Sequence, residues 1–240
     1  MPDSDSSTPP AAVREPRRVG ANQAFAWYSE ALRLFKRRPF EFAGLSVAII
    51  VAELVISLIP VIGRPAANVV VPLLASSLLF ASLATDRDDR PRFTHLVAPF
   101  AAPVSAIAAV ILASLVVFLA EWLVAWHLAD VNLLANHDPA TLGPVAIFAV
   151  YTIGVAVSLP LTLVPLLAFF EQSSVKDAFA GSIAAFTRNV PAFLLYGALS
   201  IALLGLALIT MGVGFAIALP LWAASSYAAW KNLFGLDSRD

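Results

Sequence analysis

Two carboxylates lie where an amino-acid sequence rarely places them. Glu53 interrupts AIIVAELVISLIP, residues 48–60, and Glu121 interrupts LAEWLVAWH, residues 119–127. An ionised acidic side chain costs about 2.5–3.5 kcal/mol at the centre of a membrane helix, so each must be paired, protonated or turned into a helical bundle. With Arg64 and His127 close by in sequence, these residues predict an intramembrane polar cluster of Glu53, Glu121, Arg64 and His127.

Two interpretations of this cluster differ in their chemistry. At 1.5 Å per residue, Glu53 lies about 20 Å from the start of its helix, in the outer half of the bilayer. Glu121 lies near the outer end of the third span, and Arg64 and His127 lie close to the same surface. A functional cluster would handle protons or cations at the outer mouth of the bundle. A structural cluster would have Arg64 neutralise one carboxylate while the other reaches water, with His127 in an ordinary interfacial position.

Composition decides what surrounds these carboxylates. Of the 240 residues, 60% are hydrophobic and only 13% are charged, whereas soluble domains carry roughly 25% charged residues. No Asp, Glu, Lys or Arg occurs in 65–85, 96–120, 139–170 or 189–230. Uncharged apolar runs of about 18 residues or more are long enough to cross a bilayer as helices. We therefore predict an all-α, polytopic helical membrane protein.

Six transmembrane helices are expected, as three hairpins with interfacial amphipathic helices. The spans are predicted at about 40–60, 65–85, 103–126, 144–170, 191–211 and 213–233, the last two divided at the turn MGVG. Residues 1–22 are predicted to be a disordered cytoplasmic tail, because they are rich in Ser, Pro, Asp and Arg, and 236–240 a cytoplasmic end.

A helix over 23–38 precedes the first span and is amphipathic. Its apolar face carries aromatic residues and its polar face is basic, which is typical of a helix lying among lipid headgroups. The residues predicted to contact the lipid interface are Trp27, Arg33, Lys36, Arg37 and Arg38. Anionic lipids at the cytoplasmic face are the partners that these basic residues favour.

The basic residues also predict the orientation. With the N-terminus inside, fourteen of the fifteen Lys and Arg residues are cytoplasmic and only Arg64 is outside. This asymmetry follows the positive-inside rule and places both termini in the cytoplasm. The abundance of arginine and alanine is typical of a GC-rich bacterial genome, so we expect the bacterial inner membrane.

Parts of the sequence resemble one another. FKRRPF at 35–40 resembles FTRNVPAF at 186–193, and VPLLASSLL at 71–79 resembles LPLWAASSY at 219–227. A weaker copy begins at FTHLVAPF, so each unit would be an interfacial helix, an outward span and an inward span with a proline. The three helix-kink prolines are Pro72, Pro160 and Pro220. They either free backbone carbonyls near a shared cavity or merely bend packed helices whose neighbours satisfy those groups.

Longer motifs resemble a known group of proteins. WYSEALRLFKRRPF, SLIPVIG, SVKDAFAGSIAAFTRNVPAFLLYG and LPLWAASSYAAWKNLF follow one another in the order seen in an uncharacterised family of bacterial six-span integral membrane proteins. The chain is also distantly similar to the membrane domain of bacterial glycerophosphodiester phosphodiesterases. The resemblance covers about residues 23–235. It implies the fold and the location, and it carries no catalytic residue.

Several classes of function are disfavoured. The chain has no cysteine, which excludes disulfides and thiolate chemistry, and it lacks the common nucleotide-binding and hydrolase motifs. We therefore expect no enzyme activity, no cofactor, no metal and no nucleic-acid partner. The leading hypothesis is a transporter or channel-like component with a polar, water-accessible cavity that includes Glu53. The alternative is a membrane scaffold or lipid-interacting protein. This hypothesis predicts a bundle without a water-filled cavity, a neutralised Glu53, and interfacial helices that carry out the function.

Overall fold

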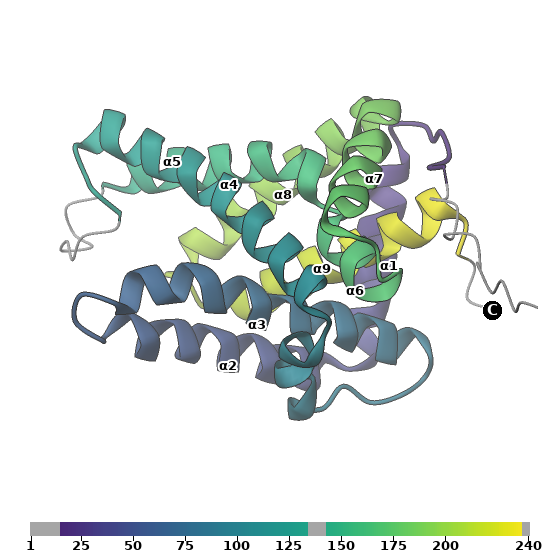
Figure 1. The fold of residues 1–240 in the computed structure, drawn as a ribbon, viewed down its shortest axis with the longest axis horizontal. Coiled ribbons are helices and arrows are strands. Elements are labelled where there is room, and N and C mark those ends of the chain that lie inside the picture. The colour runs from purple at the N-terminus through teal and green to yellow at the C-terminus, as the bar shows by residue number, and fades with distance from the viewer. Residues whose placement is uncertain (1–14, 134–142, 237–240) are drawn as a thin grey trace, which may run out of the picture.

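The computed structural model describes residues 15–133 and 143–236, and these residues form helices without any strand. The predicted all-α polytopic class is confirmed. In chain order the elements are α1 (Gln23–Arg37), α2 (Pro39–Ser57), α3 (Gly63–Asp86), η1 (Phe93–Ala101), α4 (Val104–Ala129), α5 (Pro144–Ser158), η3 (Leu159–Leu161), α6 (Val164–Phe170), α7 (Val175–Arg188), α8 (Val190–Ile209) and α9 (Phe215–Phe234) (Figure 1).

The bundle has two ends, which we name for reference. The terminal end carries residues 15–22, the C-terminus of α9 and the helices α1 and α7, which cross the direction of the long helices there (Figure 1). The distal end carries the turns at 58–62 and 210–214. The second turn lies where MGVG predicted it, and Gly212 adopts a positive φ of 88°, a conformation that glycine adopts without steric cost.

Five helices among the described residues are long and apolar enough to cross a membrane. They are Pro39–Ser57, Gly63–Asp86, Val104–Leu128, Pro144–Leu161 and Val190–Ile209. The sixth predicted span, α9, has 20 residues but does not belong to this set. The reason is its composition: α9 is long enough, but Ser225, Ser226, Lys231 and Asn232 make it less apolar. The same helix packs against α1, α2, α3 and α8, and residues 224–230 are all buried. A helix covered by protein can carry the polar side chains that a lipid-facing helix excludes.

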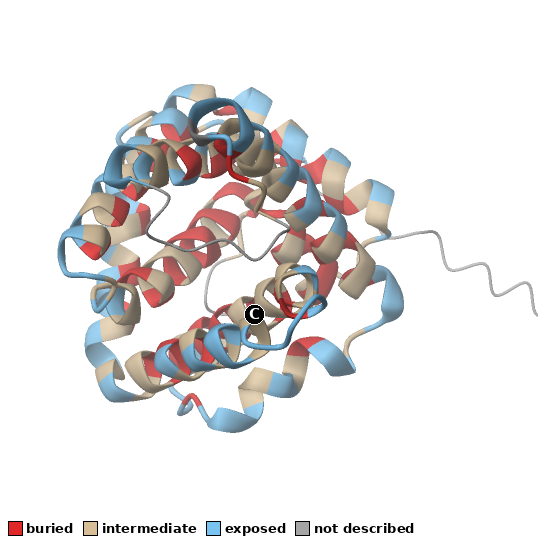
Figure 2. Ribbon diagram, turned by 90° about the vertical axis from the view of Figure 1, so that its left-hand side faces the viewer, coloured by how far each residue is buried: buried red, intermediate tan, exposed pale blue. Residues whose placement is uncertain are grey.

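Lipid-facing surface is clearest on α4. Leu112, Leu115, Val116, Leu119 and Leu123 recur at three- and four-residue steps and are 41–54% exposed. Figure 2, which looks onto the distal end, shows exposed positions on the outer faces of the helices and buried positions between them. An apolar outer stripe of this kind suits contact with acyl chains.

The span predicted over 144–170 is not one helix. It is divided into α5, η3 and α6, because Pro160 and Pro165 lack the N–H groups that a continuous helix needs. Ser182 of α7 bridges the break: its Oγ donates to the carbonyl of Pro160 at 2.8 Å and accepts from the Leu163 N–H at 3.1 Å. Pro160 therefore ends a helix and docks α7.

Pro72 and Pro220 remain inside α3 and α9. A proline at position i cannot bond the carbonyl at i−4, which frees the carbonyls of Asn68 and Ala216. The Ser76 hydroxyl also bonds the Pro72 carbonyl at 2.9 Å. The two prolines thus interrupt hydrogen bonding without ending their helices.

The apolar face of α1 contacts protein. Trp27 is 1% exposed, and its Nε1 donates to Asn232 Oδ1 of α9 at 3.2 Å. Tyr28 shares a 2.7 Å hydrogen bond with Ser200 of α8, and burial raises the pKa of its hydroxyl. The prediction that Trp27 anchors α1 in the lipid interface is therefore wrong, since amphipathic spacing does not distinguish a lipid-facing stripe from a protein-facing one.

Part of the predicted disordered tail has a defined position. Residues 1–14 lie outside the described residues, as do 237–240 of the predicted cytoplasmic end, but residues 15–22 cross the terminal end. Arg17 donates its N–H to the Leu233 carbonyl at 2.7 Å, and the Asn189 side chain bonds the Val19 N–H and the Arg17 carbonyl. Polar composition predicted disorder here, but the buried amide of Asn189 satisfies this backbone.

Candidate functional site

A cavity of about 1030 Å³ lies among α2, α3, α4, α5, α8 and α9. Most of its lining is apolar, from residues such as Val71, Val117, Leu204, Phe215 and Leu219. Val51 is 50% exposed and Met211 at the distal turn is 93% exposed. These exposed lining residues mark the opening of the cavity toward the distal end.

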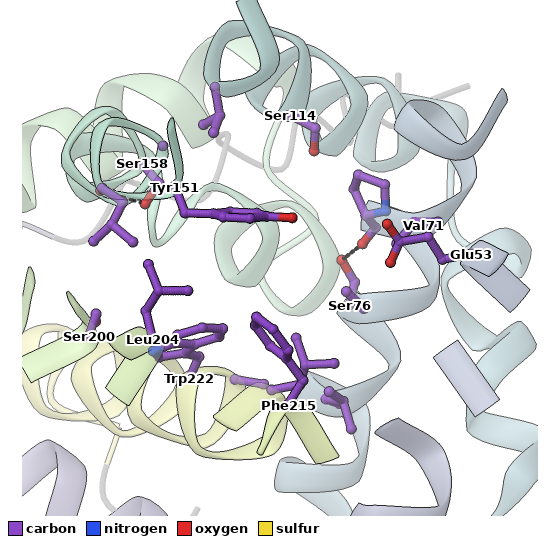
Figure 3. A pocket seen from close by; sticks show the side chains of 18 of the residues that line it. Glu53, Val71, Ser76, Ser114, Tyr151, Ser158, Ser200, Leu204, Phe215 and Trp222 are labelled. Atoms are coloured by element: carbon purple, nitrogen blue, oxygen red, sulfur yellow. Dashed lines mark hydrogen bonds between the residues drawn. The ribbon is translucent and has the colours of Figure 1, made fainter. Parts of the chain in front are cut away.

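Glu53 of α2 lines this cavity and is exposed. Figure 3 shows its carboxylate on the α3 side of the space, near Val71 and Ser76, with the Tyr151 hydroxyl of α5 directed toward it across the cavity. Tyr151, Glu53 and Glu121 all line the same cavity. Tyr151 is thus a polar group that α5 contributes to the same cavity as the two carboxylates.

Glu121 of α4 also lines the cavity and is half-buried. Its carboxylate lies directly against Gly154 of α5, where a Cβ would collide with it. The absence of a side chain at Gly154 therefore makes room for Glu121 between α4 and α5. Neither Glu53 nor Glu121 forms an ion pair with any residue in the described ranges.

The other two members of the predicted cluster lie elsewhere. Neither Arg64 nor His127 lines the cavity. His127 is exposed, and its Nδ1 is 2.8 Å from the Leu123 carbonyl of its own helix. The four-residue cluster is therefore wrong in composition, and the structural interpretation with an Arg64 ion pair also fails within the described chain. Residues at a similar depth in the membrane can lie on faces of their helices that point in different directions.

Hydroxyl groups supply much of the remaining polarity. Ser76, Ser114, Ser158, Ser200 and Ser226 line the cavity. Each donates its hydroxyl hydrogen to a carbonyl three or four residues earlier, at 2.8–2.9 Å. A hydroxyl whose hydrogen is engaged in this way keeps only acceptor capacity for a ligand.

Two of the predicted helix-kink prolines release backbone carbonyls of residues that line the cavity. Asn68 and Ala216, whose carbonyls Pro72 and Pro220 release, both line it. Pro72 lines it as well, whereas Pro160 and Pro220 do not. The proposal of carbonyls freed beside a shared cavity therefore fits Pro72 and Pro220. At Pro160, the carbonyl of Ala156 accepts from the Leu159 N–H instead, and Ser182 bonds the carbonyl of Pro160.

The basic residues of α1 lie at the terminal end, away from the cavity. Arg33 bonds Glu30, which raises the pKa of its guanidinium, and is 3.6 Å from Asp86. Arg37 pairs with Asp88 at 2.9 Å. Lys36 is exposed, and Arg38 lines a small pocket of about 250 Å³ with Arg37 and Asp88. Contact of these residues with anionic lipid stays a prediction.

Sequence reasoning missed Tyr151 and Gly154. The available signal was a tyrosine with no interfacial position in the middle of an apolar run, and a glycine one turn later. Pairing them with Glu53 and Glu121 required the arrangement of the hairpins, which the sequence pattern alone did not provide.

No family model, curated protein or solved structure matches this chain. The resemblance to the six-span bacterial family and to the phosphodiesterase membrane domain therefore stays a prediction.

Proposed function

We propose that this protein is a non-enzymatic membrane transporter or channel-like component, whose pathway includes the cavity between its hairpins. The observation that carries the proposal is a large cavity among the candidate spans with two carboxylates that have no basic partner in the described chain. Because ionised carboxylates are costly in a dry membrane interior, these two need water, a bound proton or a substrate, and a transport pathway supplies each of these.

The alternative function, a scaffold or lipid-interacting protein, needs a dry bundle and interfacial helices free to act. Two observations weigh against it: the bundle is hollow, and the apolar face of α1 is covered by α8 and α9. The exposed Lys36 remains suited to anionic headgroups. Following the distribution of basic residues, the proposal places both termini in the cytoplasm of a bacterium and the cavity opening outside.

Cysteine accessibility tests this function, because the chain has no cysteine of its own. Ser76 and Ser77 are neighbours on α3, but only Ser76 lines the cavity, and Ser77 is fully buried elsewhere. In sealed vesicles of both orientations, a membrane-impermeant maleimide should label Ser76→Cys from either side and leave Ser77→Cys unlabelled. Ile62→Cys, in the exposed distal turn, reports which side faces the reagent.

The outcomes separate the hypotheses. Labelling of Ser76→Cys from both sides supports a pathway through the cavity. Labelling from one side only contradicts transport, and the absence of labelling from either side, with Ile62→Cys labelled, contradicts a water-accessible cavity altogether.

A further inference from the structure

We infer that the cavity binds a lipophilic organic cation, such as a quaternary ammonium or phosphonium compound with apolar substituents. This inference rests on the proposed function and names the substrate class for the same cavity. It follows from the charge, the hydrogen-bonding character and the size of the lining.

The charge of the lining has one sign. Glu53 and Glu121 contribute carboxylates from α2 and α4, and no Lys, Arg or His is among the lining residues. The basic residues of the described chain that form ion pairs do so at the terminal end, with Glu15, Glu30, Asp86 or Asp88. A cationic ligand would therefore meet two carboxylates whose charge no basic side chain compensates.

The neutral polar groups favour the same ligand. The hydroxyls of Ser76 and Ser114 donate their hydrogens to backbone carbonyls, so they keep acceptor capacity for a ligand in the cavity. The lining residues Asn68 and Ala216 add carbonyls that the prolines release from helical bonding. Asn68, Tyr151 and Trp222 also carry N–H or O–H groups, but these groups are neutral and add no positive charge to the lining.

The apolar and aromatic lining indicates that the ligand also carries apolar groups. Phe118, Tyr151, Phe215 and Trp222 line the cavity among many aliphatic side chains, and Figure 3 shows Tyr151, Phe215 and Trp222 around one space. Aromatic faces attract cations. The volume of about 1030 Å³ lies at the upper end of ligand sites, roughly 300–1000 Å³. A small hydrated metal ion would leave most of this apolar surface without contact, whereas a lipophilic cation fills it.

An isosteric pair of ions tests the inference directly. Tetraphenylphosphonium and tetraphenylborate have nearly the same shape and apolar surface but opposite charge. Binding of each is measured to the full chain in phosphatidylcholine nanodiscs, with empty nanodiscs subtracted. We expect saturable binding of the phosphonium and at least tenfold weaker binding of the borate. Equal binding of the two ions, or no saturable binding of the phosphonium, would overturn the inference.

Variants locate the site. Glu53→Gln combined with Glu121→Gln should weaken phosphonium binding at least tenfold, whereas Glu41→Gln, in the first turn of α2 outside the cavity, should leave it unchanged. Glu121→Asp keeps the charge and should retain most of the binding even if a glutamine variant folds poorly. Unchanged affinity in the double glutamine variant, or loss of binding in Glu41→Gln alone, contradicts the site.

The proposed function and this inference fail in different ways. If Ser76→Cys is labelled from both sides but the phosphonium binds no better than the borate, transport stands and the cationic substrate class falls. If the phosphonium binds through Glu53 and Glu121 but Ser76→Cys is labelled from one side only, the site stands and transport falls.

Discussion

Asp86 at the terminal end and Glu121 in the cavity are both carboxylates set between helices, but their neighbours differ. Asp86 has a side chain only 7% exposed, accepts from Tyr227 at 3.0 Å and pairs with Lys231, and has Arg33 at 3.6 Å. Glu121 has no ion-pair partner in the described chain and rests against Gly154. One carboxylate joins α1, α3 and α9, and the other is available to water or a ligand.

Glu171 and Glu53 show the same contrast between the two regions. Glu171 at the terminal end accepts from Trp230 Nε1 at 2.8 Å, whereas Glu53 lines the cavity. The terminal end is thus held together by satisfied polar groups, and the cavity keeps acceptors without partners. Removing one partner of a buried ion pair leaves the other charge uncompensated, so the loss of a carboxylate is expected to destabilise the terminal end much more than the cavity.

The largest effect is expected at Asp86. Asp86→Asn leaves Lys231 partly buried without its counter-charge, and removing one partner of a buried pair costs about 3–5 kcal/mol. We expect the free energy of unfolding, measured by titration with SDS in mixed micelles, to fall by about 3 kcal/mol. Asp88→Asn is the matched control: its side chain is 87% exposed in its pair with Arg37, so the loss should stay below about 1 kcal/mol. Equal losses would contradict the contrast.

A smaller effect is expected at the cavity carboxylates. Neither Glu53→Gln nor Glu121→Gln strands a basic partner, so each should change the free energy of unfolding by less than about 1 kcal/mol in either direction. The same SDS titration measures both. A loss as large as that of Asp86→Asn would mean that these carboxylates are structural and that the comparison between the two regions fails.

The smallest effect on stability is expected at Gly154. Gly154→Ala gains up to about 1 kcal/mol of helix propensity, which offsets the displacement of the Glu121 side chain by the new methyl group. Unfolding should therefore change little, while the affinity for tetraphenylphosphonium should fall severalfold because Glu121 is moved. Gly205→Ala on α8, where a Cβ has only one contact, at 4.0 Å, is the control and should leave affinity unchanged.

Several features of this fold could be predicted from sequence because local chemistry determines them. Missing charge over long runs predicted membrane helices, and MGVG predicted the turn between α8 and α9. The break within 144–170 was missed because hydropathy stays high through LPLTLVP, although its two prolines prevent a continuous helix. The span prediction for α9 relied on the absence of charge over 189–230, but an uncharged segment can still contain enough polar residues to lower its hydropathy.

The candidate site was only half predictable. Glu53 and Glu121 stood out because lipid penalises charge wherever the helices pack. Arg64 and His127 were joined to them by depth alone, but a helix has several faces at one depth, and only tertiary packing decides which face meets the cavity. Trp27 illustrates the same limit, since the spacing of its apolar neighbours fits both a lipid surface and the surface of α9.

The contact between α1 and α9 has a consequence for biosynthesis. Trp27 bonds Asn232, and the Arg17 N–H bonds the Leu233 carbonyl, so the first described helix packs against the last. The ribosome makes α1 some two hundred residues before these partners exist. During that interval Trp27 lacks the Asn232 side chain that accepts its hydrogen bond, and α1 reaches its final packing only after α9 has been translated. The packing of the terminal end therefore depends on a helix that is translated long after α1.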